Sequence, residues 1–200
     1  MATVNEPAFW QRLYEQGADG WELGEPAPAL VDFVETRPPA IGRVAVPGCG
    51  RGHDVRFLAS RGYEAVGFDF APAALEAARL LAERDHVSAT FEPRDVFSLA
   101  GDHAGAFDGV WEYTCFCAID PERRAEYARV LETILRPGGW LLACFYPVRA
   151  GGGGPPFPVS RIEISQLFGP LFRIERLGRP LRSPQNRRGE ELVMLARKAA

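Results

Sequence analysis

Apolar and polar residues follow one another along the chain in blocks that predict strands and helices in turn. Short apolar runs of strand length lie at Val44–Val46, Ala65–Phe68, Ala89–Phe91, Gly109–Trp111 and Trp140–Phe145. Helical patterns lie between most of these runs. Because strands that alternate with helices form right-handed βαβ units, the pattern predicts a parallel sheet covered by helices on both faces.

The helical patterns carry recognisable start and stop signals. Residues 71–85 are rich in Ala and Leu, with Pro72 near the start, and residues 121–135 begin at Pro121 with Asp120 as N-cap and stop at "RPGG". Two shorter helices are expected earlier, around residues 8–16 and 29–36. The elements therefore predict a doubly wound α/β domain.

The C-terminal part departs from the alternation. The runs "FRIERLGRP" and "EELVMLARK" both resemble strands, and an arginine-rich polar loop joins them without a helix. A hairpin here adds an antiparallel strand to the end of a mostly parallel sheet. The segment "GGGGPP" is a loop by composition.

Composition narrows the class of protein. With 200 residues, one domain covering 1–200 is expected, and a net charge of -3 disfavours nucleic acid as partner. No stretch has the pattern of a signal peptide or a membrane span, so a cytoplasmic monomer without a membrane partner is expected. The four cysteines and three histidines have no metal-ligand spacing. We expect no metal, and we expect the cysteines to be reduced and buried.

The first candidate for chemistry is the glycine cluster in "RVAVPGCGRGHDV". Gly48, Gly50 and Gly52 follow the first apolar run and precede a helix, the place where doubly wound sheets bind ligands. A tight turn that needs positive φ is the alternative. A dinucleotide fingerprint, G-x-G-x-x-G, requires a third glycine where His53 stands, which disfavours NAD and FAD.

Acidic residues follow the next two predicted strands. Asp69 ends "VGFDF", where a carboxylate can accept the ribose hydroxyls of an adenosine, and capping of the following helix is the alternative or additional role. Asp95 and Val96 follow the third strand, where an acid and a backbone N–H can bind the adenine edge. These loops together indicate S-adenosylmethionine as cofactor.

The segments "FDGVWEYTCFCAIDP", "FYPVRAGGGGPPF" and "ISQLFGPLF", with the glycine loop, resemble the thiopurine S-methyltransferase family. The chain is most similar to its thiol, thiocyanate and halide methyltransferase branch, from "FWQRLYEQGADGW" to the last strand. The resemblance implies a Rossmann-like class I methyltransferase fold, with seven strands of which the C-terminal one is antiparallel. It also implies that residues 1–40 form a helical lid over the cofactor.

In that branch, N-terminal aromatic residues close over the cofactor, and the matching positions are Trp10, Tyr14 and Trp21. Their aromatic faces can attract a sulfonium by a cation–π interaction. A stripe of core residues on one helix is the alternative for Trp10 and Tyr14. Gly48, Gly50, Asp69, Asp95 and Val96 match the family's cofactor contacts.

Two tyrosines match positions near the reacting groups. Tyr113 lies near the methionine part of the cofactor and the acceptor in relatives, where the animal thiopurine enzymes have arginine. Tyr146, after the fifth strand, would face the transferred methyl, or it is a buried strand aromatic. The loss of that arginine favours small acceptors. Arg149 attracts an anionic substrate or is a solvated surface residue.

The predicted reaction is methyl transfer by direct displacement to a small thiol or related soft nucleophile: hydrosulfide, thiocyanate, halide, or a selenium or tellurium anion. Such nucleophiles are already reactive, so no dedicated general base is expected, and Asp54 is expected to start the helix that carries His53. One alternative is an oxygen or nitrogen acceptor, with Glu112 or Tyr146 as base. The other is a sensor that binds the cofactor without chemistry.

Overall fold

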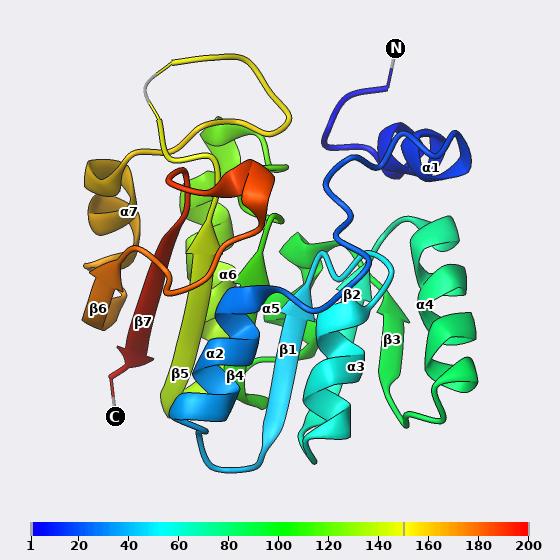
Figure 1. Ribbon diagram of the computed structural model, residues 1–200. Coiled ribbons are helices and arrows are strands. Elements are labelled where there is room, and N and C mark those ends of the chain that lie inside the picture. The colour runs from blue at the N-terminus through cyan, green and yellow to red at the C-terminus, as the bar shows by residue number, and fades with distance from the viewer. Residues whose placement is uncertain (1, 150, 200) are drawn as a thin grey trace.

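The computed structural model describes residues 2–149 and 151–199. Its centre is one seven-stranded sheet in the order β3-β2-β1-β4-β5-β7-β6 (Figure 1). The strands are β1 (Arg43–Pro47), β2 (Glu64–Asp69), β3 (Thr90–Pro93), β4 (Phe107–Tyr113), β5 (Leu135–Phe145), β6 (Phe172–Gly178) and β7 (Leu192–Lys198). Strands β1 to β5 pair in parallel, whereas β7 is antiparallel to both β5 and β6. The predicted mostly parallel sheet with an antiparallel C-terminal strand is confirmed. Strand β7 lies between β5 and β6 and leaves β6 at the edge.

Helices cover both faces of the sheet (Figure 1). They are α1 (Pro7–Glu15), α2 (Pro28–Thr36), α3 (His53–Ser60), α4 (Pro72–Arg84), α5 (Leu99–Asp102), α6 (Arg124–Ile134) and α7 (Arg161–Phe168), with short 3₁₀ turns η1 (Val96–Ser98), η2 (Pro121–Arg123) and η3 (Gln185–Arg187). One buried cluster joins Leu30, Leu58 and Leu75 of α2, α3 and α4 to the sheet. A second joins α6 and α7 to the other face, through Tyr127 and Phe168. Helix α1 lies apart, above the carboxyl ends of the parallel strands (Figure 1).

The elements expected from the sequence are present, with three differences. The helix predicted over 121–135 begins as the 3₁₀ turn η2, and its N-cap Asp120 accepts from the N–H of Glu122 as expected. Strand β5 begins at Leu135, five residues earlier than predicted. Leu135 pairs with Phe107 and Trp140 with Gly109, so residues 136–139 form an irregularity in the register.

The third difference is α7, a helix that the hydrophobic pattern did not predict. Its N-cap Ser160 accepts from the N–H of Glu163, the first half of a capping box, and its buried residues Ile164 and Phe168 are four apart. The Ser-x-x-Glu spacing was the available sequence signal. Within the described residues, no helix combines the length and apolar character needed to cross a bilayer.

Candidate active site

A cavity of about 580 Å³ opens at the carboxyl edge of the sheet, beneath the N-terminal segment. All ten residues proposed from the sequence line it: Trp10, Tyr14, Trp21, Gly48, Gly50, Asp69, Asp95, Val96, Tyr113 and Tyr146. They come from α1 and the connection after it, and from the ends of β1 to β5. The topology therefore brings together every predicted site residue.

The glycine loop connects β1 to α3, and its three glycines all have positive φ. A Cβ at Gly48 would lie 2.8 Å from Sγ of Cys115, and one at Gly52 would lie 2.6 Å from the Phe91 ring. The alternative of a turn that needs glycine therefore accounts for these two positions without a ligand. At Gly50 a Cβ would lie 3.0 Å from the Tyr14 hydroxyl oxygen, inside the cavity.

Asp69 ends β2 with its carboxylate facing the glycine loop. Its Oδ2 accepts from the N–H of Gly50 at 3.0 Å, and its Oδ1 accepts from the N–H of Ala71 at 2.9 Å. Burial raises the pKa of the carboxyl, and the two N–H donors counteract that rise. Ala71, not Asp69, is the N-cap of α4, so the capping alternative is wrong in detail. A carboxylate has about four acceptor positions, so Asp69 can still bind hydroxyls.

Asp95 and Val96 lie on the neighbouring loop, after β3. Oδ1 of Asp95 accepts from the N–H of Phe97 at 3.0 Å and caps η1. The residue is exposed but still lines the cavity. The surface role and the cavity position are therefore both present.

The three N-terminal aromatic residues contact one another over the cavity. The ring of Trp21 is 5.5 Å from the rings of both Trp10 and Tyr14, in edge-to-face arrangements. Trp10 donates from Nε1 to the Val4 carbonyl at 2.8 Å, and burial raises the pKa of the Tyr14 hydroxyl. Trp10 packs with Ala71 and Ala74 of α4 in a small core cluster, so it serves as core and as cavity wall.

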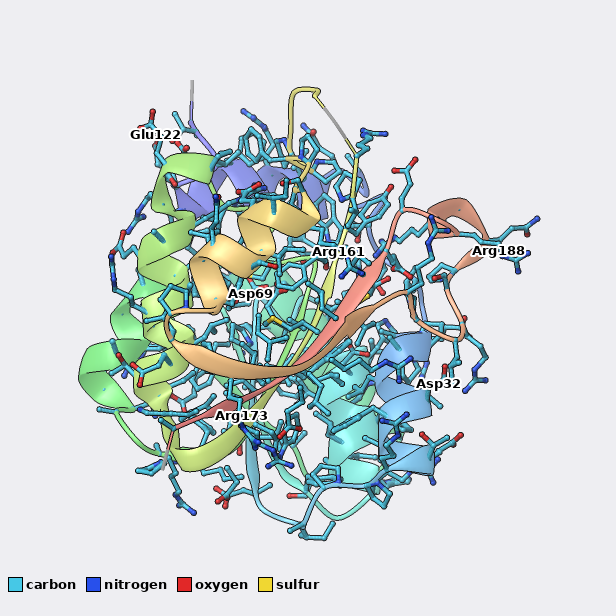
Figure 2. The ribbon with its side chains drawn as sticks, turned by 90° about the vertical axis from the view of Figure 1, so that its left-hand side faces the viewer. Asp32, Asp69, Glu122, Arg161, Arg173 and Arg188 are labelled. Carbon is cyan, nitrogen blue, oxygen red and sulfur yellow. The ribbon has the colours of Figure 1, made fainter. Side chains whose placement is uncertain are left out.

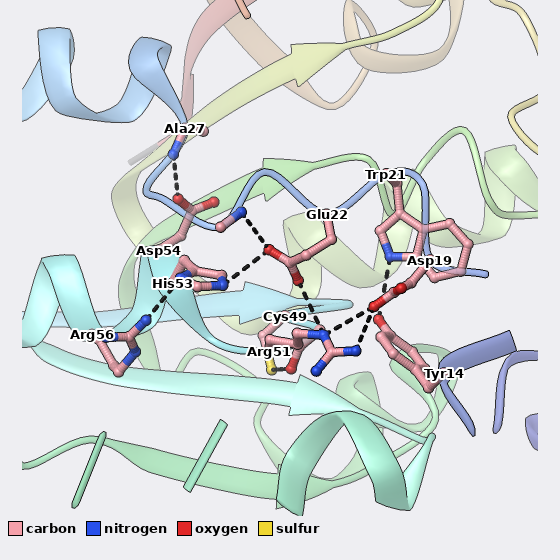
Figure 3. Close-up of polar contacts among 12 residues, drawn as sticks. Tyr14, Asp19, Trp21, Glu22, Ala27, Cys49, Arg51, His53, Asp54 and Arg56 are labelled. Atoms are coloured by element: carbon pink, nitrogen blue, oxygen red, sulfur yellow. Dashed lines mark hydrogen bonds and ion pairs between the residues drawn. The ribbon is translucent and has the colours of Figure 1, made fainter. Parts of the chain in front are cut away.

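The segment that carries Trp21 is fastened to the glycine loop by polar contacts (Figure 3). Asp19 accepts from Nε and Nη2 of Arg51 at 2.9 and 2.6 Å, and Oε1 of Glu22 lies 2.9 Å from Nε2 of His53. Burial opposes ionisation of Glu22, but the His53 and Gly24 hydrogen bonds and nearby cations lower its pKa. We call residues 19–27 the strap.

Asp54 anchors the C-terminal end of the strap. Its Oδ1 accepts from the N–H of Ala27 at 2.7 Å, and its Oδ2 accepts from Nε1 of Trp111 at 2.6 Å. Burial raises the pKa of this carboxyl. Asp54 lies in the first turn of α3 as predicted, but its main contacts join α2 and β4. The sequence gave no sign of these contacts.

The far end of the cavity contains a cation that sequence reasoning missed. Arg187 of η3 is 2% exposed, and its guanidinium carbon lies 5.1 Å from the Tyr113 ring centroid and 4.9 Å from that of Tyr146. Its Nη2 donates to the Trp21 carbonyl at 2.6 Å, and its Nη1 is buried without a partner among residues 2–149 and 151–199. No local motif marked it, because Arg187 is one of several arginines in a polar loop.

Beside it, the hydroxyl of Tyr113 donates to Oε1 of Glu191 at 2.7 Å. Glu191 is 2% exposed and immediately precedes β7. Its Oε2 is also without a hydrogen-bond partner in the described part of the chain. The sequence did not single out Glu191, which is 78 positions from Tyr113.

Three other predicted features have different surroundings. Glu112 is fully buried, accepts from the N–H of Phe116 at 2.6 Å and does not line the cavity, so it is wrong as a base for an oxygen or nitrogen acceptor. Burial raises its pKa to about 7. Arg149 lies outside the cavity and pairs with Glu190 at 3.5 Å on the surface. Its neighbour Ala150 lies outside the described residues, while Pro155 and Pro156 of the glycine-rich loop line the cavity.

All four cysteines are free thiols. Burial raises the pKa of each, in Cys117 to about 12. Three of them, Cys49, Cys115 and Cys117, line the cavity but are held as thiols, which makes them poor nucleophiles. Among the described residues there is no group of three His, Cys, Asp or Glu side chains placed to hold a metal.

The residues at the β1–β3 end of the cavity fit S-adenosylmethionine. Only hydrogen fits at Gly50 without crowding Tyr14, and the Asp69 carboxylate retains acceptor capacity at the position where doubly wound folds bind ribose. The aromatic walls suit a sulfonium. Fold and cavity define a class I methyltransferase that uses S-adenosylmethionine.

Comparison with known proteins identifies the family. Residues 5–198 match thiopurine S-methyltransferase (TPMT), and the chain belongs to this family. A probable thiol methyltransferase 2 from Arabidopsis thaliana is 36% identical over 175 residues, which cover 86% of this chain and 76% of that protein. Thiocyanate methyltransferase 1 from Brassica oleracea is 33% identical over 189 residues, covering 93% and 83%.

A solved structure supports the fold. The 1,6-didemethyltoxoflavin-N1-methyltransferase from Burkholderia thailandensis, crystallised with S-adenosylhomocysteine, superposes with a TM-score of 0.78 at 21% identity and covers 100% of this chain and 92% of its own. The protein is therefore an S-adenosylmethionine-dependent S-methyltransferase that acts on a small-molecule acceptor.

Proposed function

We propose that the acceptor is a small, soft, anionic nucleophile such as a thiolate, hydrosulfide, thiocyanate or iodide. The observation that carries this proposal is the guanidinium of Arg187, buried at the acceptor end of the cavity with Nη1 unpartnered in the described chain. A buried cation that lacks a full set of partners favours an anion beside it. The relatives named as thiol and thiocyanate methyltransferases support the same class of acceptor.

The surroundings of Arg187 favour weakly hydrated anions over strongly hydrated ones. Its neighbours at this end of the cavity are the rings of Tyr113 and Tyr146, together with Pro155 and Pro156. An apolar surface replaces little of the hydration that a small hard anion loses, so that anion is disfavoured. Large polarisable anions lose less hydration and gain dispersion contacts with the rings.

The cofactor would be held by Gly48 and Gly50 at the loop, by Asp69 at the ribose, and by Asp95 with Val96 at the adenine. Trp10, Tyr14 and Trp21 would cover it. When bound, S-adenosylmethionine supplies a methyl group on a sulfonium, open to direct displacement by the acceptor. Tyr113 and Tyr146 would line the path of the acceptor to that methyl.

The contribution of the chain is alignment and exclusion of water. Residues 1–40 would act as a helical lid on one domain of residues 1–200, with the strap holding Trp21 against the cavity through Arg51, His53 and Arg187. Positioning of two reactants can supply roughly 7–11 kcal/mol of the barrier. The glycine-rich loop could open and close the acceptor end. A cytoplasmic monomer stays a prediction, which light scattering can test for the oligomeric state.

An acceptor panel tests the proposal. The purified protein is incubated with labelled S-adenosylmethionine and iodide, thiocyanate, hydrosulfide, 2-mercaptoethanol, a phenol or an amine, and methylated products and S-adenosylhomocysteine are measured. Turnover of the sulfur and iodide acceptors is expected. Turnover of only the phenol or amine would replace the proposal with an oxygen or nitrogen methyltransferase, and cofactor binding without any acceptor-dependent product would indicate a sensor.

A further inference from the structure

The Tyr113 hydroxyl lies between the cavity and a buried carboxylate. Tyr113 lines the cavity, whereas Glu191 lies behind it and accepts the tyrosine proton at 2.7 Å. Because the hydroxyl hydrogen is directed to Glu191, its oxygen lone pairs are free toward other groups. The second oxygen of Glu191 has no partner in residues 2–149 and 151–199, so nothing there fixes the carboxylate against gaining a proton.

Other acids at the cavity are already engaged as acceptors. Asp69 and Asp95 accept backbone N–H groups, and Asp54 accepts from Ala27 and Trp111. Glu22 pairs with His53. Protonation of any of these would break contacts that hold the loop or the strap. Glu191 differs, because its one described partner is a hydroxyl that can move its proton.

We propose that Tyr113 and Glu191 form a proton relay for acceptors that arrive as neutral thiols, an inference that rests on the proposed function. The S–H bond of the thiol breaks and its proton passes to Oη of Tyr113, while the Tyr113 proton passes to Oε1 of Glu191. The freed sulfur electron pair forms the new bond to the methyl carbon, and the electrons of the old bond leave with the departing thioether. Glu191 then returns the proton to solvent through Tyr113.

The charges around the pair favour this transfer. Arg187 of η3 lies against the Tyr113 ring and stabilises negative charge on the acceptor sulfur. The other titratable groups nearby are Cys144 of β5, Tyr146 after β5, and Asp54 of α3, which bonds the Trp111 indole stacked on Tyr113. Burial keeps Cys144 a thiol. Glu191 acts through Tyr113 and does not itself touch the acceptor.

Acceptors with and without a proton test the relay. Iodide has no proton to lose, whereas a reference thiol of pKa about 8.5 is only about 3% thiolate at pH 7. For Glu191→Gln we expect the ratio of kcat/KM for 2-mercaptoethanol to kcat/KM for iodide to fall about 30-fold at pH 7, the limit set by that thiolate fraction. Toward pH 9 the ratio should return close to the wild-type value, because the solution then supplies thiolate. Tyr113→Phe should show the same pattern.

Two controls separate the relay from other causes. Glu190→Gln changes the neighbouring, half-exposed carboxylate and should keep the wild-type ratio at both pH values. An equal fall of the Glu191→Gln ratio at pH 7 and pH 9, or no fall at either, would refute the relay and leave Glu191 a structural partner of Tyr113.

A measurement without turnover completes the test. With S-adenosylhomocysteine bound, 2-mercaptoethanol added at pH 7 should give thiolate ultraviolet absorbance with the wild type and much less with Glu191→Gln. Equal absorbance in both would contradict the relay. If the wild type methylates neither iodide nor thiol, the proposed function fails, and this binding experiment still decides whether the pair accepts a thiol proton.

Discussion

The two ends of the cavity are built in different ways. The cofactor end comes from three successive strand–loop units, with its residues between positions 48 and 96. The acceptor end combines Tyr113, Tyr146, Arg187 and Glu191, from β4, β5 and the segment before β7. A doubly wound sheet places successive strand ends side by side, whereas the acceptor end exists only because β7 returns between β5 and β6. Proximity in sequence thus marks one end and not the other.

The two ends also differ in how their polar groups are satisfied. Asp69 and Asp95 are fixed by backbone N–H groups, so the cofactor end is preorganised. At the acceptor end, Nη1 of Arg187 and Oε2 of Glu191 are buried and have no partner in the part of the chain that the structure describes. Such groups gain most from a ligand or a proton. The first end is ready to hold a fixed ligand, and the second to respond to one.

The largest expected effect is at the cofactor end. Asp69→Ala should weaken S-adenosylhomocysteine binding at least about 100-fold, because two charge-assisted hydrogen bonds at about 1.5 kcal/mol each are lost. Isothermal titration calorimetry measures the affinity, and circular dichroism checks the fold. Asp102→Ala, an exposed acid of α5, is the matched control and should bind as the wild type does. Unchanged affinity in Asp69→Ala would refute the ribose role.

The difference between the ends also explains what the sequence could predict. Hydrophobic periodicity and the spacing of glycines and acids predicted the strands, the antiparallel tail and every residue proposed for the cofactor end. Arg187 and Glu191 were missed because each acts across the sheet, on a tyrosine that no local pattern connects to it. The glycine loop was only partly understood, since Gly48 and Gly52 are required by Cys115 and Phe91 from distant strands.

The second prediction concerns the acceptor end. Arg187→Met keeps most of the side-chain volume but removes the charge, and should lower kcat/KM for iodide and thiocyanate about 30-fold, or about 2 kcal/mol, the range of a hydrogen bond to a charged group. Cofactor affinity should change no more than about threefold, through loss of the bond to the Trp21 carbonyl.

Arg188→Met provides the control for charge in general. Arg188 is exposed and points away from the molecule (Figure 2). Equal losses in the two variants would mean that Arg187 acts only through the overall field at the cavity. A loss in cofactor affinity as large as the loss in acceptor turnover would contradict the division into two ends.

A third, smaller effect distinguishes structural from ligand-dependent glycines. Gly48→Ala meets both a positive φ of 61° and the Cys115 side chain at 2.8 Å, whereas Gly138→Ala meets only a positive φ of 75° with open space around it. Gly48→Ala should therefore lower the free energy of unfolding about 1–2 kcal/mol more than Gly138→Ala, as overpacking typically does. Urea denaturation measures both. Equal losses would return Gly48 to a role in ligand approach.

The smallest expected effect lies in the strap, which contacts both ends of the cavity. Asp19 and Arg51 form a half-exposed ion pair next to the glycine loop, and pairs of this kind contribute about 0.5–1 kcal/mol because solvent screens them. A double-mutant cycle of Asp19→Asn and Arg51→Met should give a coupling of that size in S-adenosylhomocysteine affinity. The ratio of thiol to iodide turnover should stay unchanged, since the Tyr113–Glu191 pair does not touch this ion pair. A change in that ratio would show that the strap couples the two ends, and would contradict their independence.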